Sequence, residues 1–175
     1  KEYPWTDRDR ELYLGGKAVA SKIMYDNFTG REDPFSEENL IIISTGPVTG
    51  TFAPSSNRFD ISSLSPLTGI SSSSNCGGDF GFYLKKAGLD ALIIRGKSEK
   101  PIWIEIDDGK LSYHPAEELR GMRTGETQAV LRKKLAELHG PKGRYGMVSI
   151  GPAGENLVRY AAVISGERAA GRAGI

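Results

Sequence analysis

The sequence reads LIIIS over residues 40–44 and TGPVTG over residues 45–50. A short aliphatic, β-branched run of this kind predicts a buried strand. The Gly and Pro residues after it predict a loop that ends the strand. The sequence IGPAG at residues 150–154 also follows a predicted strand, which hints at a duplicated element.

Helices are predicted on both sides of this strand. Apolar residues at near-helical spacing indicate helices over residues 7–26, 79–87 and 124–138. Gly15 and Gly16 interrupt the first helix and predict a kink or a break. Gly88 suits the C-cap of the second helix, and Thr124 suits the N-cap of the third.

The chain contains more predicted strands than helices. Further strands are predicted over residues 58–64, 91–95, 101–107, 110–113, 145–150 and 158–164. Asp108-Gly109 predicts a hairpin with a type I′ turn. Because the strands pair mostly as neighbours, the predicted fold class is α+β, with antiparallel or mixed β-sheets and a few helices. We expect residues 1–175 to form a single domain.

Composition excludes several classes of protein. The chain has 23 basic and 22 acidic residues, which argues against a general polyanion binder. It contains no run of basic residues interleaved with aromatic residues, so no binding of nucleic acid is expected. The longest aliphatic stretches are far shorter than the roughly 20 residues that cross a bilayer, so no membrane association is expected. Cys76 is the single cysteine, which excludes an internal disulfide and fits a cytoplasmic location. A self-contained iron-sulfur cluster, which needs about four thiolates, is excluded as well.

The glycine-rich, basic segment 166–175 shows no closing strand or helix. We therefore expect the chain to be a fragment of a longer, multi-domain protein. The 22 glycines also predict backbone that something approaches closely.

Three segments carry residues suited to an anionic ligand. Asn75-Cys76-Gly77-Gly78 precedes a predicted helix, and backbone N–H groups at a helix N-terminus favour phosphate. The alternative is a tight strand-to-helix turn in which Asn75 caps the helix. Arg58 could direct its rigid set of donors at a phosphate or a planar heterocycle, or be a surface arginine.

The third segment is Arg168-Ala169-Ala170-Gly171-Arg172, in which small residues permit close approach and two arginines supply charge-assisted hydrogen bonds. The alternative is a flexible basic tail. Together the three segments favour a phosphate-bearing ligand more than any one of them does.

The remaining reactive side chains have no convincing partners in the sequence. Cys76 lacks the histidine that a nucleophilic thiol needs, and His114 and His139 are expected at the surface. Glu155 is expected to cap the turn that follows it. We predict no catalytic residue within this chain.

These segments, with two further loops, resemble the amino-terminal domain of the aldehyde:ferredoxin oxidoreductases. The matching motifs are TGPVTGT at 45–51, Arg58, LSPLTG at 64–69, NCGG at 75–78, IGPAGENL at 150–157 and RAAGR at 168–172. Their order and spacing agree with the family from about Leu14 to the last residue. The sequence departs from the family at Cys76, where serine is common, and the hairpin that usually precedes the helix near Leu14 is missing.

The resemblance implies a domain that forms the base of a tungsten cofactor, with tungsten favoured over molybdenum. In this family two pyranopterins hold the metal through their dithiolenes, and a magnesium ion bridges their phosphates. By position, Asn75 and Ala169 would bind the magnesium through main-chain carbonyls, and Gly77 and Arg168 would lie against the pterin and its phosphates. Arg58 would lie between a pterin and a 4Fe-4S cluster whose ligands are outside this chain.

The implied reaction is oxidation of an aldehyde with water to a carboxylate. Electrons would pass through the iron-sulfur cluster to ferredoxin or another electron-transfer protein, and the isolated chain is expected to be inactive. The identity of the substrate and the presence of a homo-oligomer are left open. The alternative function is a non-catalytic pterin- or phosphate-binding fragment or accessory module.

Overall fold

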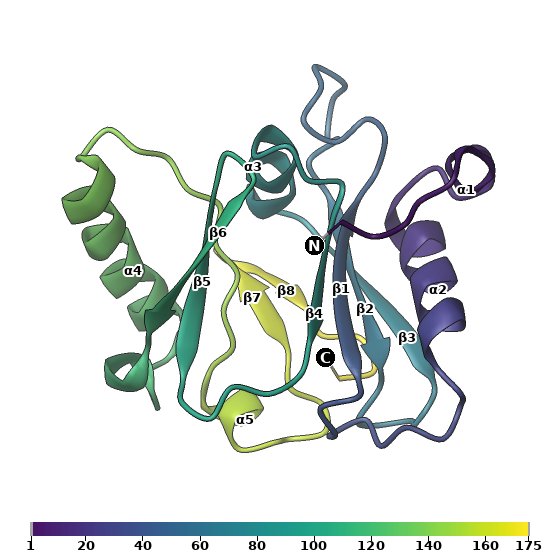
Figure 1. Ribbon diagram of the computed structural model, residues 1–175. Coiled ribbons are helices and arrows are strands. Elements are labelled where there is room, and N and C mark those ends of the chain that lie inside the picture. The colour runs from purple at the N-terminus through teal and green to yellow at the C-terminus, as the bar shows by residue number, and fades with distance from the viewer. Residues whose placement is uncertain (1, 175) are drawn as a thin grey trace.

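The computed structural model describes residues 2–174 (Figure 1). Its centre is an antiparallel sheet of four strands in the order β3-β2-β1-β4. The strands are β1 (Leu40–Thr45), β2 (Phe59–Leu64), β3 (Ser71–Cys76) and β4 (Ala91–Arg95). The predicted α+β class with antiparallel sheets and few helices is confirmed.

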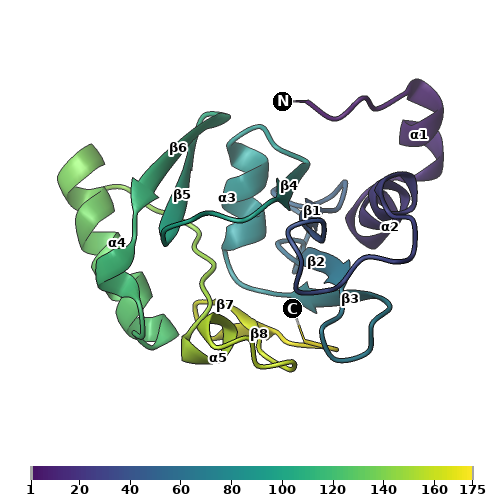
Figure 2. The ribbon, with the colours of Figure 1, turned by 60° about the horizontal axis from the view of Figure 1, so that its bottom comes forward.

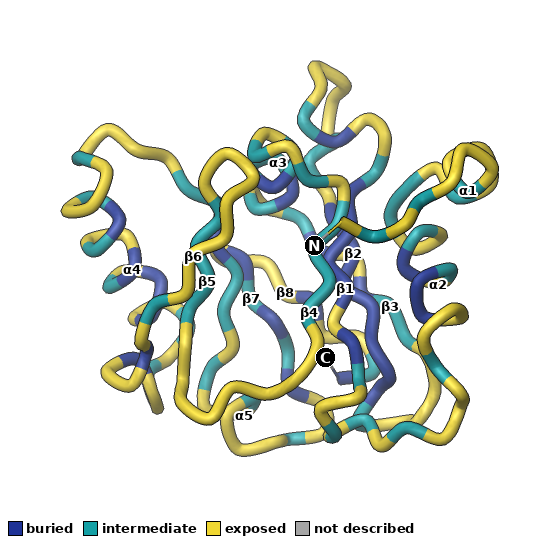
Figure 3. The backbone as a smooth tube through the Cα atoms, viewed as in Figure 1, coloured by how far each residue is buried: buried dark blue, intermediate teal, exposed yellow. Residues whose placement is uncertain are grey.

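The strand β1 is buried on both faces, as predicted. Ile42 packs toward helix α2 (Gly16–Asn27), together with Ile23 and Met24. Ile43 packs on the opposite face, in a cluster with Leu84 of helix α3 (Phe80–Lys86). Figure 3 shows this buried centre in dark blue, with the loops around it exposed.

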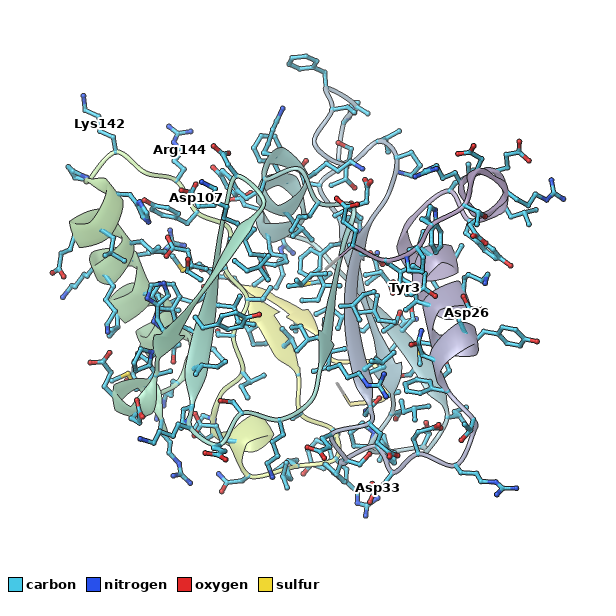
Figure 4. The ribbon with its side chains drawn as sticks, viewed as in Figure 1. Tyr3, Asp26, Asp33, Asp107, Lys142 and Arg144 are labelled. Atoms are coloured by element: carbon cyan, nitrogen blue, oxygen red, sulfur yellow. The ribbon has the colours of Figure 1, made fainter. Side chains whose placement is uncertain are left out.

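The N-terminal helix is divided in two, at the glycines that predicted a break. Helix α1 (Asp7–Leu12) ends before Gly15, and α2 begins at Gly16. A Cβ at Gly15 would lie 2.8 Å from the carbonyl oxygen of Thr45, so only glycine allows α2 to begin against the end of β1. The Tyr3 hydroxyl donates to Asp26 on α2 at 2.8 Å, and Figure 4 shows the two side chains side by side.

A second layer lies beside the sheet and has its own apolar cluster. The hairpin of β5 (Ile102–Asp107) and β6 (Lys110–Pro115) packs against α4 (Thr124–His139), with Trp103, Leu131 and Leu135 between them. Asp108 and Gly109 have φ of 44° and 77°, as a type I′ turn requires, so the predicted hairpin is confirmed. Figure 2 shows the hairpin between α4 and the central sheet.

The short elements complete the chain. They are a 3-10 helix (Glu117–Leu119), α5 (Pro152–Glu155) and a hairpin of β7 (Val163–Ser165) and β8 (Arg168–Ala170). None of the helices in residues 2–174 is long and apolar enough to cross a membrane.

The central sheet contains one strand, β3, that was not predicted. Its four serines, residues 71–74, pair with β2 in continuous register. The hydroxyl of Ser73 donates to Asp60 at 2.9 Å, so cross-strand pairing outweighs the low strand propensity of these residues.

Two predicted strands near the C-terminus are wrong, and one strand there was not predicted. Residues 145–150 form only one isolated bridge, Ser149 to Ile164, so the hinted duplication is absent. The strand expected over 158–164 is reduced to β7, and β8 was not predicted.

The predicted N-cap of α4 is also wrong, since the N-cap is Arg123 and not Thr124. The carboxylate of Glu126 accepts the Arg123 backbone N–H at 2.9 Å and holds the cap one residue earlier.

Candidate cofactor site

Arg58 and Asn75 meet at one end of the β2–β3 pair. Arg58 immediately precedes β2, and its Nε donates to the side-chain oxygen of Asn75 while Nη2 donates to the Asn75 carbonyl at 3.4 Å. The Asn75 amide in turn donates to the carbonyl of Phe59 at 3.2 Å. The guanidinium is therefore positioned by neutral groups, and its charge stays available to a ligand.

Gly77 lies between two arginines. A Cβ at Gly77 would be 3.7 Å from Arg58 Nη1 and 3.8 Å from Arg168 Cγ, so both side chains border the bare backbone at this position. Arg168 begins β8, which lies against β3, and the Arg172 N–H donates to Ser74 Oγ at 3.1 Å. The three segments singled out in the sequence are thus brought together.

The two arginines of this site are exposed and carry unneutralised charge. In the described part of the chain neither Arg58 nor Arg168 forms an ion pair with a carboxylate. Two nearby like charges without a counter-ion repel each other, so this arrangement favours an anion between them.

Ala169 is also placed at this site. It lies in β8 beside Arg168, pairs with Ile164 and is exposed. Its proposed magnesium contact, like that of Asn75, stays a prediction. Across residues 2–174 no group of three His, Cys, Asp or Glu side chains is arranged to hold a metal ion.

Helix α3 does not provide the N-terminal site that was predicted. It has seven residues and begins at Phe80 with Asp79 as N-cap, so the alternative reading of Asn75 as the cap is also wrong. Asn75 lies within β3, and the turn at Gly77 and Gly78 separates it from the helix. The site consists of strand ends and arginines, with no direct role for a helix terminus.

Cys76 is buried beneath the candidate site. Its side chain is 1% exposed, and burial raises the pKa of its thiol, although Arg58 and Arg168 act in the opposite direction. A thiol of this kind packs as a small apolar side chain, so the expectation that it has no nucleophilic role is consistent with its surroundings.

The two histidines have a partner that the sequence did not indicate. His114 Nε2 lies 2.9 Å from Glu105 Oε2, and His139 Nε2 contacts the other oxygen. His139 is exposed as expected, but His114 is half-buried and stacks on Trp103 with ring centroids 4.1 Å apart. This group fastens the β5–β6 hairpin to the end of α4.

Glu155 also has a different partner from the one expected. Its carboxylate accepts the backbone N–H of Gly121 at 2.8 Å, so it holds the loop before α4 and does not cap its own turn.

The surface has one cavity beside the β5–β6 hairpin and another beside the turn at Gly78. The larger, about 600 Å³, lies between the hairpin and α4 and is lined by Trp103, His114 and Lys134, none of which belongs to the candidate site. The smaller, about 240 Å³, is lined by Gly78 and Arg168 and also by Arg132 of α4. Arg132 was not recognised in the sequence, because only the packing of α4 brings it there.

The described chain is thus an antiparallel sheet with a glycine turn between arginines, flanked by a hairpin–helix layer. The family model of the aldehyde ferredoxin oxidoreductase N-terminal domain matches residues 1–175, and the chain belongs to this family.

Sequence comparisons agree with the family model. The chain is 42% identical to the tungsten-containing aldehyde ferredoxin oxidoreductase of Pyrococcus furiosus, over 95% of the chain and 27% of that protein. It is 41% identical to the enzyme of the same name from Thermococcus kodakarensis, over 93% of the chain and 26% of that protein. It is 31% identical to an aliphatic sulfonate oxidoreductase WOR-like subunit of P. furiosus, over 94% of the chain and 28% of that protein. The chain therefore spans about a quarter of the length of these relatives.

A solved structure has the same fold. The active-site complex BamBC of benzoyl coenzyme A reductase, in complex with 1,5-dienoyl-CoA, superposes with a TM-score of 0.91 at 38% identity, over 99% of this chain and 26% of that one. The relatives are oxidoreductases whose names cover different substrates.

Proposed function

We propose that this chain forms the base of a tungsten bis-pyranopterin site in a larger oxidoreductase. The observation that carries the proposal is the pair of arginine side chains that border Gly77, Arg58 through its guanidinium and Arg168 through its aliphatic stem, neither of them paired with a carboxylate in the described chain. A phosphate-bearing cofactor fits this donor set, because guanidinium groups bind phosphate through charge-assisted hydrogen bonds. The tungsten-containing relatives support the choice of metal.

Each residue of the site has a proposed role. Gly77 and Arg168 would contact a pterin and its phosphates, while the carbonyls of Asn75 and Ala169 would bind a magnesium ion. Arg58, held by Asn75, would face both a pterin and a 4Fe-4S cluster whose ligands lie outside this chain. The residues of this chain bind and orient the cofactor, and they move no proton and form no bond to substrate.

The cofactor supplies the two-electron chemistry when it is bound. The whole protein would oxidise an aldehyde to a carboxylate, with water as the oxygen source, and pass electrons through the cluster to ferredoxin or another electron carrier. The names of the relatives that are about 40% identical support this substrate class and this partner. We propose a cytoplasmic location, as the single cysteine suggests.

Elemental and pterin analysis tests the proposal. The full-length protein, purified without oxygen after growth with tungstate, is expected to contain tungsten, iron and pterin, and to reduce benzyl viologen with an aldehyde. The 175-residue chain alone is expected to contain none of them and to show no activity. Full-length protein that lacks tungsten and pterin would instead favour a non-catalytic module, and activity of the short chain would contradict its role as a base only.

A further inference from the structure

A cavity of about 240 Å³ opens beside the Gly77–Gly78 turn and reaches helix α4. Arg132 of α4 and Arg168 of β8 both line it, together with Gly78, Asp79, Gly146 and Glu167. Figure 1 shows how this happens: β7 and β8 lie between α4 and the central sheet, so a helix distant in sequence faces the candidate site.

The walls of this cavity are held by close backbone contacts. A Cβ at Gly78 would lie 3.1 Å from Ser165 Oγ and 3.3 Å from its carbonyl oxygen, and Gly78 has a φ of 93°. A Cβ at Gly146 would lie 2.6 Å from Phe80 Cα. Side chains at these two glycines would force the segments apart, so the shape of the cavity depends on their absence.

Helix α4 is anchored one turn before Arg132. Gln128 is 5% exposed, and its amide donates to Ser149 Oγ at 3.1 Å and to the Ile164 carbonyl at 3.3 Å. Residues four apart on a helix share a face, so Arg132 is held over the cavity while its side chain remains exposed.

The charges that line the cavity are not paired with one another. Within residues 2–174 neither arginine forms an ion pair, although Asp79 and Glu167 line the same cavity. The two guanidinium groups are therefore available to bind an anionic group, and the two carboxylates are available to accept hydrogen bonds from N–H donors. A phosphate ester attached to a nitrogen heterocycle presents both kinds of group.

We propose that this cavity takes one phosphate-bearing end of the pterin cofactor, with Arg132 as a second phosphate ligand opposite Arg168. The cavity is smaller than the roughly 300–1,000 Å³ of pockets that enclose a whole ligand, so it holds one end and not the complete cofactor. This inference rests on the proposed function and adds α4 to the binding site.

Substitution of Arg132 in the full-length protein tests the inference. In Arg132→Gln, pterin and tungsten per polypeptide should fall, and the cofactor should dissociate about tenfold faster, since one charge-assisted hydrogen bond is lost. Arg132→Lys keeps the charge without the fork and should fall between that variant and wild type. Lys133→Gln removes the neighbouring exposed charge, which does not line the cavity, and should behave as wild type.

The outcomes separate this inference from the proposed function. If Arg132→Gln keeps wild-type cofactor content and release while Arg168→Ala loses cofactor, the role of Arg132 is overturned and the proposed function stands. Wild-type protein without pterin would overturn both. Equal losses in Arg132→Gln and Lys133→Gln would show a general effect of helix charge and would also overturn it. If Arg132→Gln fails to fold, a structure of the loaded protein decides by whether the Arg132 guanidinium lies within hydrogen-bond distance of a phosphate oxygen.

Discussion

Charged groups are arranged in opposite ways in two regions of this molecule. On the β5–β6 hairpin, Glu105 contacts both His114 and His139, so the carboxylate and the two imidazoles satisfy one another, and His114 also stacks on Trp103. Around Gly77, Arg58 and Arg168 lie side by side without a carboxylate partner in the described chain. The first arrangement stabilises the fold internally. The second leaves two charges without a carboxylate partner in the described chain, which is the basis of the proposed ligand site.

Removal of the two arginines should have the largest effect, and it should fall on the cofactor. In full-length Arg58→Ala/Arg168→Ala, pterin and tungsten retention should drop by about a hundredfold or more, because each charge-assisted hydrogen bond contributes about 1.5–3 kcal/mol. Metal analysis and pterin fluorescence measure the loss, with Arg31→Ala as a control that removes an exposed arginine elsewhere. A double variant that keeps its cofactor but unfolds more easily would mean that the arginines serve the fold.

Removal of the carboxylate at the centre of the histidine pair should act on stability. Glu105→Ala deprives His114 and His139 of their acceptor, and the change should lower the free energy of unfolding by about 2 kcal/mol. Denaturant unfolding followed through Trp103 measures this, and Glu99→Ala, an exposed residue in a loop, provides the control. If Glu105→Ala leaves the stability unchanged but loses the cofactor, Glu105 serves ligand binding and not the fold.

Two neighbouring glycines separate binding from folding. Gly77→Ala adds a Cβ at ordinary contact distances of 3.7 and 3.8 Å, so it should fold normally but obstruct the ligand. Gly78→Ala requires an alanine at a φ of 93° and 3.1 Å from Ser165 Oγ, which should cost about 1–3 kcal/mol of stability. Gly77→Ala should therefore lower the pterin content more than the Tm, and Gly78→Ala should lower the Tm more than the pterin content. If both variants lose stability equally, Gly77 is structural as well.

Glu32 is a surface charge satisfied by the backbone, and it should have the smallest effect. Its carboxylate accepts the backbone N–H of Thr29 at 2.6 Å, the Thr29 hydroxyl at 2.8 Å and the Gly30 N–H at 3.0 Å, and these hydrogen bonds lower its pKa from 4.5 to about 2. A lowered pKa in the folded state contributes stability above pH 4.5, and this contribution disappears as the pH falls through 2. The difference in Tm between wild type and Glu32→Gln should therefore shrink between those pH values. A difference in Tm that does not change with pH would contradict a stabilising role of the ionised Glu32 carboxylate.

The sequence predicted those features of the fold that depend on local signals. The aliphatic run of β1, the glycine break before α2 and the Asp108-Gly109 turn each determine their structure over a few residues. The strand β3 was missed because four serines have little strand propensity, and only pairing with β2 and the hydroxyl bonds to Asp60 make them one.

The candidate site shows the same limit. The meeting of Arg58, Asn75, Gly77 and Arg168 followed from motifs matched to a family, whereas spacing along the chain only suggested an anion. Arg132 carried no signal, because Gln128 anchors α4 through bonds to residues 21 and 36 positions away. The partners of Glu105 were hidden in the same way, since His139 lies 34 positions from it.

The two tryptophans of the chain lie in different apolar clusters, Trp5 beside α2 and Trp103 beside α4. Neither lines the cavity next to Gly78. Each flank therefore carries its own tryptophan as an optical reporter, while no tryptophan lines the space between them. In variants that keep only Trp5 or only Trp103, tryptophan fluorescence would report the unfolding of one flank at a time. The fluorescence of a bound pterin would report the space between the two flanks.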